Sequence, residues 1–399
     1  MVEVNHIWLF LPMFNEQSAA TESIRFFAQL ALAAPSSLVV KVIVVTTERE
    51  TELCAGENVR STRAIAQNIA LEINGQIGET LVLHEHYPDP LGWKPHQLNW
   101  AIGRRIEAEP SMLPERTMIA VYDVDARPDS QTLDALSRMI DSNGCGPEVA
   151  QQLSAYFPTR GRDPHHTLWG AMASLWQTRF TFAIERSMIE SSRSSHSRRL
   201  LWSVANGFFL RLDTWSRIGG FTEIYHTEDI ELGYRLSSLG ISITLVSPLL
   251  ETGNPSDFAS DVKQKFRWFG GLFDYVRYPS TCRSGSRLLH AWLMSQGVGR
   301  AILWVVCGPV LVLSWLAPAI FGSSVETWMV AAAAYLLPVG LVSMTLIAIA
   351  SVPSCSRAKD AVLRVPVILA VPILAPLYAV SYGFGPMLYV LAAAVRKRS

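Results

Sequence analysis

Residues 118–125 read MIAVYDVD, a run of apolar side chains that ends in two aspartates. An apolar run without polar alternation is typical of a strand buried on both faces of a parallel sheet. Asp123 and Asp125 are one residue apart, so both carboxylates can reach the same divalent cation. The alternative is an ordinary turn, because Asp often follows a strand and residues 127–129 (RPD) are typical of turns. The stretch therefore predicts a parallel sheet and leaves both interpretations of its acidic end open.

The sequence before this stretch alternates between strand-like and helix-like patterns. The expected strands cover residues 6–11, 38–46, 81–84 and 118–124, and the expected helices cover residues 18–34, 60–73 and 95–107. Such a βαβ series predicts an α/β fold with a Rossmann-like, mostly parallel sheet. In sheets of this kind the ligands bind at the carboxyl ends of the strands.

Charged residues are distributed unevenly along the 399-residue chain. Its 34 Lys and Arg residues balance 34 Asp and Glu residues, and together they make up 17% of the chain. Soluble domains contain about 25%. Only nine of the charged residues lie in residues 300–399, so a polar first part joins an apolar last part near residue 300. This distribution excludes an ordinary soluble enzyme, and the zero net charge argues against a nucleic-acid partner.

Three uncharged segments follow residue 300, and each has the roughly 20 residues that a membrane span requires. They cover residues 301–321, 327–353 and 365–395. The first two predict transmembrane helices. The third contains four prolines and predicts either one kinked helix or a hairpin. A hairpin fits the basic residues 396–398 better, because it returns them to the cytoplasmic side.

These segments predict an integral membrane protein with two domains. Residues 1–285 are expected to form a cytoplasmic domain whose last part, near residues 260–285, lies at the membrane surface. Residues 286–399 are expected to form the membrane domain. Residues 7–14 are apolar but too short for a signal peptide, which favours the cytoplasmic location.

A second acidic motif, HTEDIEL, occupies residues 226–232. One interpretation is a helix start, with Thr227 as the N-cap and the acids in the first turn, where the helix dipole favours them. The other makes Glu228 or Asp229 a general base at the mouth of a helix. The sequence alone leaves both open.

A third motif, QKFRW, occupies residues 264–268. Arg267 could bind phosphate, Trp268 could stack on a sugar, and Gln264 could bind hydroxyl groups. The alternative is an amphipathic helix at the membrane surface, with Lys265 and Arg267 extending toward the headgroups. Both interpretations can hold together.

These motifs, in this order and followed by apolar segments, resemble the membrane-anchored family-2 glycosyltransferases with the GT-A fold. That family has an acidic turn after the first strand, then D-x-D, T-E-D and Q-x-x-R-W. The corresponding residues are Asn15 and Glu16, Asp123 and Asp125, Thr227, Glu228 and Asp229, and Gln264, Arg267 and Trp268. Two further segments, WKPHQLNWAIG at 93–103 and GGF at 219–221, also resemble family segments. The resemblance covers about residues 5–275.

The resemblance implies an inverting enzyme that moves a sugar from a UDP- or GDP-sugar to a hydroxyl of a lipid-linked or polysaccharide acceptor. It implies a location at the cytoplasmic face of a bacterial inner or plasma membrane. Asp123 and Asp125 would bind Mg²⁺ or Mn²⁺, and Asp229, beside Glu228, would be the general base. The implied donor contacts are Asn15, Glu16, Lys94, Asn99, Asp123 and Arg267, and the implied acceptor contacts are Gly220, Phe221, Gln264 and Trp268.

One segment departs from the family pattern. The family often has D-D-G-S after its second strand, with an acid that binds the nucleotide base, whereas residues 46–49 here read TTER. Glu48 is expected to replace that acid, which leaves the identity of the nucleotide open. Two histidine pairs, 84/86 and 165/166, lack a third ligand at metal-binding spacing and are expected to form hydrogen bonds instead.

Two other functions remain open. A membrane transport or assembly protein could use the first domain only to bind a nucleotide, although the apolar segments show no ion path. A nucleotidyltransferase could share the sheet, although residues 13–17 (MFNEQ) lack the glycine-rich loop expected there.

Overall fold

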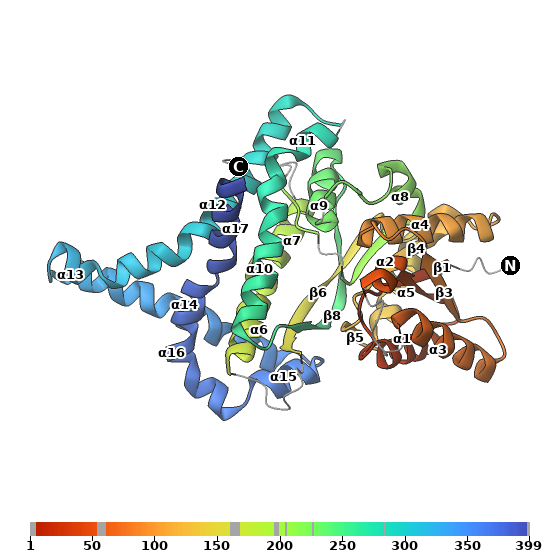
Figure 1. Cartoon of the computed structure of the whole chain (residues 1–399), viewed down its shortest axis with the longest axis horizontal. Coiled ribbons are helices and arrows are strands. Elements are labelled where there is room, and N and C mark those ends of the chain that lie inside the picture. The colour runs from red at the N-terminus through yellow and green to blue at the C-terminus, as the bar shows by residue number, and fades with distance from the viewer. Residues whose placement is uncertain are drawn as a thin grey trace. The chain divides into compact units, whose positions relative to one another are not determined.

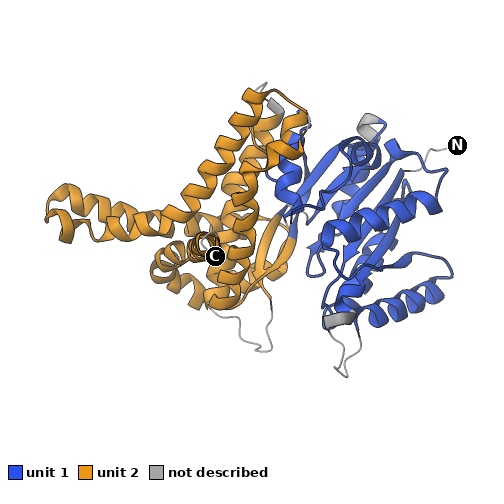
Figure 2. Ribbon diagram, turned by 45° about the horizontal axis from the view of Figure 1, so that its top comes forward, with its two compact units in different colours: residues 1–153, 202–236, 240–250 blue, residues 154–201, 237–239, 251–399 orange. Residues whose placement is uncertain are grey.

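The computed structural model describes residues 5–53, 61–159, 168–194, 199–203, 206–225, 227–282 and 284–396 (Figure 1). By packing, the chain divides into two compact units (Figure 2). Unit 1 combines residues 1–153, 202–236 and 240–250, and unit 2 combines residues 154–201, 237–239 and 251–399. The boundary between the units therefore differs from the one expected at residue 285. The internal segments 154–201 and 237–239 pack with the C-terminal helices.

Within the described ranges, the sheet has eight strands in the order β3-β2-β1-β4-β7-β6-β8-β5. The strands are β1 (Asn5–Pro12), β2 (Leu38–Thr47), β3 (Val82–Tyr87), β4 (Thr117–Val121), β5 (Arg127–Pro128), β6 (Val149–Pro158), β7 (Phe208–Arg211) and β8 (Thr244–Asn254). Parallel pairing joins β3, β2, β1 and β4, whereas β7 is antiparallel to both β4 and β6. The α/β fold with a mostly parallel, Rossmann-like sheet is therefore confirmed.

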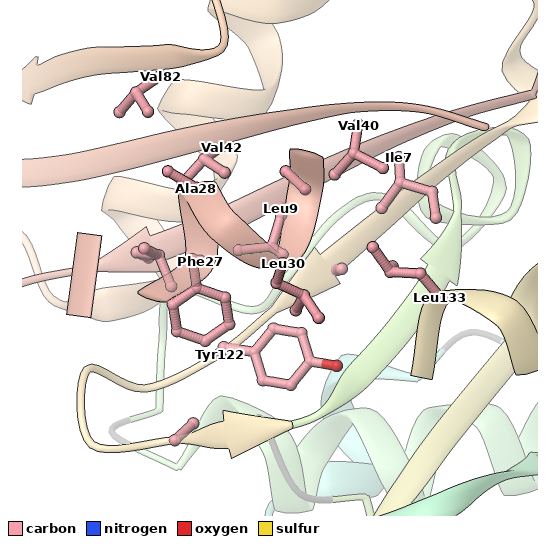
Figure 3. Packing of buried hydrophobic residues seen from close by; sticks show 14 of the residues in the cluster. Ile7, Leu9, Phe27, Ala28, Leu30, Val40, Val42, Val82, Tyr122 and Leu133 are labelled. Carbon is pink, nitrogen blue, oxygen red and sulfur yellow. The ribbon is translucent and has the colours of Figure 1, made fainter. Parts of the chain in front are cut away.

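Helices connect the parallel strands of unit 1, as the βαβ pattern predicts. They are α1 (Ala20–Leu32), α2 (Glu48–Leu53), α3 (Thr62–Ile77) and α4 (Lys94–Ala108). Of the later helices, α5 (Thr132–Asn143) lies between β5 and β6, and α8 (Leu212–Ile218) and α9 (Glu228–Leu239) lie between β7 and β8. The apolar faces of the strands and helices form one core, in which Phe27 and Tyr122 lie side by side with ring centroids 5.2 Å apart (Figure 3). The Tyr122 hydroxyl donates to Gln152 Oε1 at 2.6 Å. This anchoring fixes the backbone from which Asp123 projects.

The C-terminal part of unit 2 consists mainly of apolar helices. They are α12 (Arg287–Trp315), α14 (Val325–Ser351), α16 (Val365–Ser381) and α17 (Phe384–Arg396), and the short helices α13 (Ala317–Phe321) and α15 (Ser356–Val362) lie between them. By length and hydropathy, three segments among the described residues could cross a membrane, and they cover Arg287–Trp315, Val325–Ser351 and Val365–Val395. The prediction of three long apolar segments is confirmed. The first begins at Arg287 and not at residue 301, because α12 starts in the more polar residues before the apolar run and continues through it.

The third segment is a broken helix. Its two halves, α16 and α17, meet at Tyr382 and Gly383. They have different neighbours, because α16 packs against α6 and α14, and α17 packs along α10 (Phe258–Phe273). A hairpin would place the two halves against each other, so this packing favours one interrupted helix over the hairpin.

One helix of unit 2 was not expected there. Helix α6 (Leu168–Phe180) packs against α14 and α16, and its Ala171, Met172 and Leu175 are completely buried with residues of the apolar helices. It is followed by a π-helical turn (Thr181–Glu185) and by α7 (Arg186–Ser194). Helix α6 has only 13 residues, so its sequence gives no span signal.

Candidate active site

The D-x-D motif lies at the carboxyl end of β4. Tyr122 and Val124 are buried, whereas Asp123 and Asp125 are only half-buried, so the alternation of the chain turns both acids toward the sheet edge. The backbone turns here, since the Ala126 N–H donates to the Asp123 carbonyl at 3.0 Å. The expected turn and the expected pair of accessible acids therefore occur together.

Lys94 brings the first and second acidic motifs together. Its Nζ lies at the start of α4, 2.6 Å from Asp123 Oδ1. Burial lowers the pKa of Lys94, but the charges of Asp123, Glu228 and Asp229 outweigh it and raise the pKa above its ordinary value. Lys94 is therefore an ammonium with three carboxylates acting on it.

The acids of the second motif lie in different environments. Glu228 is 5% exposed and Asp229 is half-buried. Burial, and next the charge of Asp229, raise the pKa of Glu228 to about 7, although the charge of Lys94 opposes them. Among the described residues, Thr227 Oγ1 is buried without a hydrogen-bond partner, so its hydroxyl does not cap the helix. Helix α9 nevertheless begins at Glu228, directly after Thr227, and the acids lie in its first turn, as the helix-start interpretation predicted. Of that interpretation, only the capping hydrogen bond to the Thr227 side chain is wrong.

Glu16 lies in the turn after β1. Asn15 adopts a left-handed backbone with φ of 58°, and its N–H donates to Glu50 Oε2 at 3.2 Å. Burial, and next the charges of Asp125, Asp123 and Glu50, raise the pKa of Glu16 to about 7. Glu16 and the D-x-D acids are thus close enough to repel one another, which indicates a site that attracts cations.

These acids have the donor chemistry of a Mg²⁺ or Mn²⁺ site, because hard cations prefer carboxylate oxygens. Within the described ranges, no group of three or more His, Cys, Asp or Glu side chains is arranged to hold a metal ion. The oxygen ligands of these acids suit the expected cation, but their arrangement does not show a metal site. The assignment of Asp123 and Asp125 as its ligands stays a prediction.

Glu50 was missed by the sequence analysis. It is 2% exposed, and its carboxylate accepts hydrogen bonds from the Asn15 and Thr62 N–H groups and from the Gln17 amide. It therefore holds the Asn15 turn against the start of α3. Nothing local marks it, because Glu48 and Glu50 belong to the same acidic stretch ERETEL.

Glu48 forms a hydrogen-bonded chain at the end of β2. Its Oε2 lies 2.7 Å from His86 Nε2, and Thr46 Oγ1 lies 3.0 Å from His86 Nδ1 and 2.9 Å from His84 Nε2. Burial, and next the charges of His86 and Arg63, lower the pKa of His84 to about 4. His84 and His86 therefore form hydrogen bonds, as expected, whereas residues 165 and 166 lie outside the described ranges. The base contact of Glu48 stays a prediction.

Next to Glu48, Arg49 lies over two partly exposed aromatic rings. Its guanidinium carbon is 3.8 Å from the Trp93 ring centroid and 5.2 Å from that of Phe14. Such contacts orient a cation without neutralising it. The sequence analysis missed this contact of Arg49 with the two rings. The arginine directly after Glu48, in a segment where the family pattern is acidic, could have indicated it.

Asn99 is bound to the GGF segment. Its Nδ2 donates to the Phe221 carbonyl at 2.8 Å and to Glu223 Oε1 at 2.9 Å, while its Oδ1 accepts from the Phe221 N–H at 2.9 Å. Gly220 has φ of 77°, and a Cβ there would lie 2.9 Å from Asn99 Oδ1. Asn99 thus positions this loop. The donor role of Asn99 and the acceptor roles of Gly220 and Phe221 stay predictions.

The third motif lies on α10 in unit 2. Arg267 is exposed, and Gln264 and Trp268 are half-buried. Lys265 is 1% exposed and pairs with the buried Asp261 at 3.0 Å. The expectation that Lys265 extends toward the headgroups is therefore wrong, since its ammonium turns inward to Asp261.

Comparison with known proteins gives the family. The model of Glycosyl transferase family group 2 matches residues 118–354, more than half of the chain. The chain belongs to this family. The match includes the D-x-D, T-E-D and Q-x-x-R-W motifs and the first two apolar helices, so the resemblance found in the sequence is confirmed. The chain is a glycosyltransferase, which disfavours the transport and nucleotidyltransferase alternatives.

Among solved structures, the glycosyltransferase is similar to the mannosyltransferase PcManGT from Pyrobaculum calidifontis, determined in complex with GDP-Man and Mn²⁺. The two chains are 12% identical, with a TM-score of 0.48 over 96% of this chain and 88% of the other. No curated protein matches the sequence.

Proposed function

We propose that this glycosyltransferase transfers a sugar, with inversion, from a UDP- or GDP-sugar to a hydroxyl group of a lipid-linked or polysaccharide acceptor. The reaction would take place at the cytoplasmic face of a membrane. The observation that supports the proposal is the Lys94 ammonium, 2.6 Å from Asp123 and within the field of Glu228 and Asp229. It joins two sequence motifs in one charged site at the carboxyl ends of parallel strands, where ligands of α/β folds bind.

The departure of the nucleoside diphosphate is the costly step, because negative charge develops on its phosphates. A fixed positive charge at that point lowers the barrier, since it does not have to reorganise during the reaction. Lys94 is such a charge, and its ion pair with Asp123 keeps it in place. Asp123 and Asp125 would hold Mg²⁺ or Mn²⁺, which supplies further positive charge to the diphosphate when it is bound.

The acceptor hydroxyl must lose a proton as it attacks the anomeric carbon. Asp229 would accept that proton, because it is the more accessible acid of the pair. Burial and the charge of Asp229 raise the pKa of Glu228 to about 7, so near neutral pH Glu228 would be protonated in part of the molecules. Attack from the face opposite the leaving group inverts the configuration of the sugar.

The remaining contacts follow the family motifs. Asn15, Glu16 and Glu48 at the ends of β1 and β2, with Arg267 of the third motif, would contact the donor. Gln264 and Trp268 would contact the acceptor. The three candidate spans support an acceptor that remains at the bilayer.

The test incubates native membranes that contain the full-length protein with a panel of UDP- and GDP-sugars. We expect release of the free nucleoside diphosphate and transfer of the sugar label to a lipid or polymer fraction. Release of pyrophosphate instead would indicate nucleotidyl transfer. Binding without release of either product would indicate a nucleotide-binding protein.

A further inference from the structure

The inference concerns Arg179, which lies in unit 2, in the sequence between the first and the second acidic motif. Arg179 is in the last turn of α6, directly before the π-helical turn Thr181–Glu185. Turns of this rare type occur frequently at functional sites. The helix itself packs against the candidate spans α14 and α16, so its end lies in the membrane-associated part of the molecule.

Among the residues that the structure describes, Arg179 has no carboxylate partner. Its Nε donates to the Trp176 carbonyl at 3.4 Å, and its guanidinium carbon lies 4.1 Å from the Trp176 ring centroid. In the part of the chain that the structure describes, it forms no ion pair with a carboxylate. Burial lowers the pKa of Arg179, and the groups that oppose this effect are Tyr382, Cys307 and Tyr378, none of which carries a carboxylate.

Two other cations of the molecule are paired with carboxylates, whereas Arg300 resembles Arg179, since its Nη2 donates to the Leu200 carbonyl at 3.1 Å and no carboxylate of the described residues pairs with it. Lys265 is paired with Asp261 at 3.0 Å, and Arg235 with Glu231 at 2.9 Å. A buried charge without a counter-charge carries a large desolvation cost, which proteins normally avoid. The lack of a carboxylate beside Arg179 therefore indicates that a molecule outside the chain supplies the negative charge.

Aromatic residues indicate the depth of this site. Tyr382 lies where α16, which packs on α14, passes into α17, which packs on the charged helix α10. Its ring stacks on Trp304 with centroids 5.0 Å apart, and it lies 6.0 Å from Trp176. Trp and Tyr concentrate at the level of lipid headgroups. Arg179 thus lies at the boundary between the apolar and the charged helices.

We propose that the Arg179 guanidinium binds the phosphate group of a membrane lipid. A guanidinium presents its N–H donors in a planar fork that matches two phosphate oxygens, and it is less strongly hydrated than an ammonium. Ionisable residues at such depths commonly mark functional sites. A lipid-borne phosphate fits better than a free phosphate ion, because apolar helices surround the site and can hold the acyl chains. This site does not depend on sugar transfer, so it can be tested without a donor.

The first test measures lipid binding by the purified full-length protein in uncharged detergent. The probes are dioleoyl phosphatidic acid, dioleoylglycerol with the same chains but no phosphate, and inorganic phosphate. We expect phosphatidic acid to bind at least about tenfold more tightly than either of the other probes, and Arg179→Gln to remove that preference. Arg186→Gln is the matched control, because Arg186 is exposed and paired with Glu190 at 2.9 Å.

Equal binding of phosphatidic acid by the wild type and Arg179→Gln would overturn the proposal. Inorganic phosphate that binds as tightly as phosphatidic acid would overturn its lipid part. The second test measures thermal unfolding of Arg179→Met without added lipid. We expect a higher melting temperature than for the wild type, because an apolar side chain removes the buried uncompensated charge. An unchanged or lower melting temperature would show that the protein itself satisfies Arg179, and the proposal would fail.

Discussion

Lys94 Nζ lies 2.6 Å from Oδ1 of Asp123, and the two side chains come from α4 and from the end of β4. The contact joins a lysine and an aspartate that are 29 positions apart. It also brings Lys94 under the influence of Glu228 and Asp229. One cation thus links the acids expected to serve the leaving group with the acids expected to serve the attacking hydroxyl.

Removal of this cation is expected to slow sugar transfer. Lys94→Met should reduce kcat/KM by about 10²-fold, as is typical when one preorganised charge is lost from an active site. It should also shift the pH dependence of the rate upward, because the charge of Lys94 holds down the pKa of Glu228. Lys41→Met is the control, since Lys41 pairs with Glu109 in another ion pair. A wild-type rate and pH profile for Lys94→Met would contradict this role.

Ionisation of Glu228 is expected to destabilise the protein. Burial, and next the charge of Asp229, raise its pKa from 4.5 to about 7, so the folded state binds more protons than the unfolded chain in this window. The free energy of unfolding therefore falls as the pH rises through it. Glu228→Gln should be more stable than the wild type by about 1–3 kcal/mol near pH ~8, and the difference should shrink toward pH ~5. Thermal unfolding at both pH values measures it, and a less stable variant at the higher pH would refute the assignment.

Activity is expected to require a divalent cation. Excess chelator followed by dialysis should abolish transfer, and Mg²⁺ or Mn²⁺ should restore it. Asp125→Asn should weaken the binding of the nucleoside diphosphate in the presence of the cation, because it removes one of the two carboxylates proposed as ligands. Binding is measured by calorimetry with and without the cation. Full transfer after chelation, or unchanged cation dependence in the variant, would exclude this requirement.

The packing of α6 predicts the fate of a truncated chain. Residues 1–285 alone would expose the completely buried Ala171, Met172 and Leu175, because α14 and α16, which contact α6, would be missing. A large exposed apolar patch favours aggregation. We therefore expect the truncated chain to sediment in the absence of detergent, and the full-length chain to sediment with membranes. A monodisperse truncated chain in the soluble fraction would contradict the packing.

The sequence predicted the elements that consist of continuous apolar runs. Residues 38–46 and 118–124 lie inside a parallel sheet, so continuous apolar runs marked them as strands. The lengths of the later apolar runs marked the candidate spans. Helix α6 was not predicted as part of unit 2, because it is buried over most of its length but has only 13 residues.

The site was predicted less completely than the fold. Acids at strand ends and helix starts carry a local signal, and the structure shows that Asp123, Glu228 and Asp229 act together on Lys94. Glu50 carries none, since tertiary packing alone decides which acid of an acidic helix is buried. The contact of Arg49 with Trp93 joins loops that are distant in the sequence, so periodicity cannot find it.

The role of Asp229 is the central claim, and the Asp229→Asn variant of the full-length protein tests it most directly. The amide keeps the size of the side chain and can still accept a hydrogen bond from the Ile230 N–H, as Oδ1 does at 2.9 Å in the structure. It cannot accept the proton of the acceptor hydroxyl. The measurement is the rate of sugar transfer at saturating donor, together with the dissociation constant of the nucleotide sugar. We expect the rate to fall by about 10²–10⁴-fold with donor binding nearly unchanged. A transfer rate within a few-fold of the wild type, in a folded and saturated variant, would contradict the account.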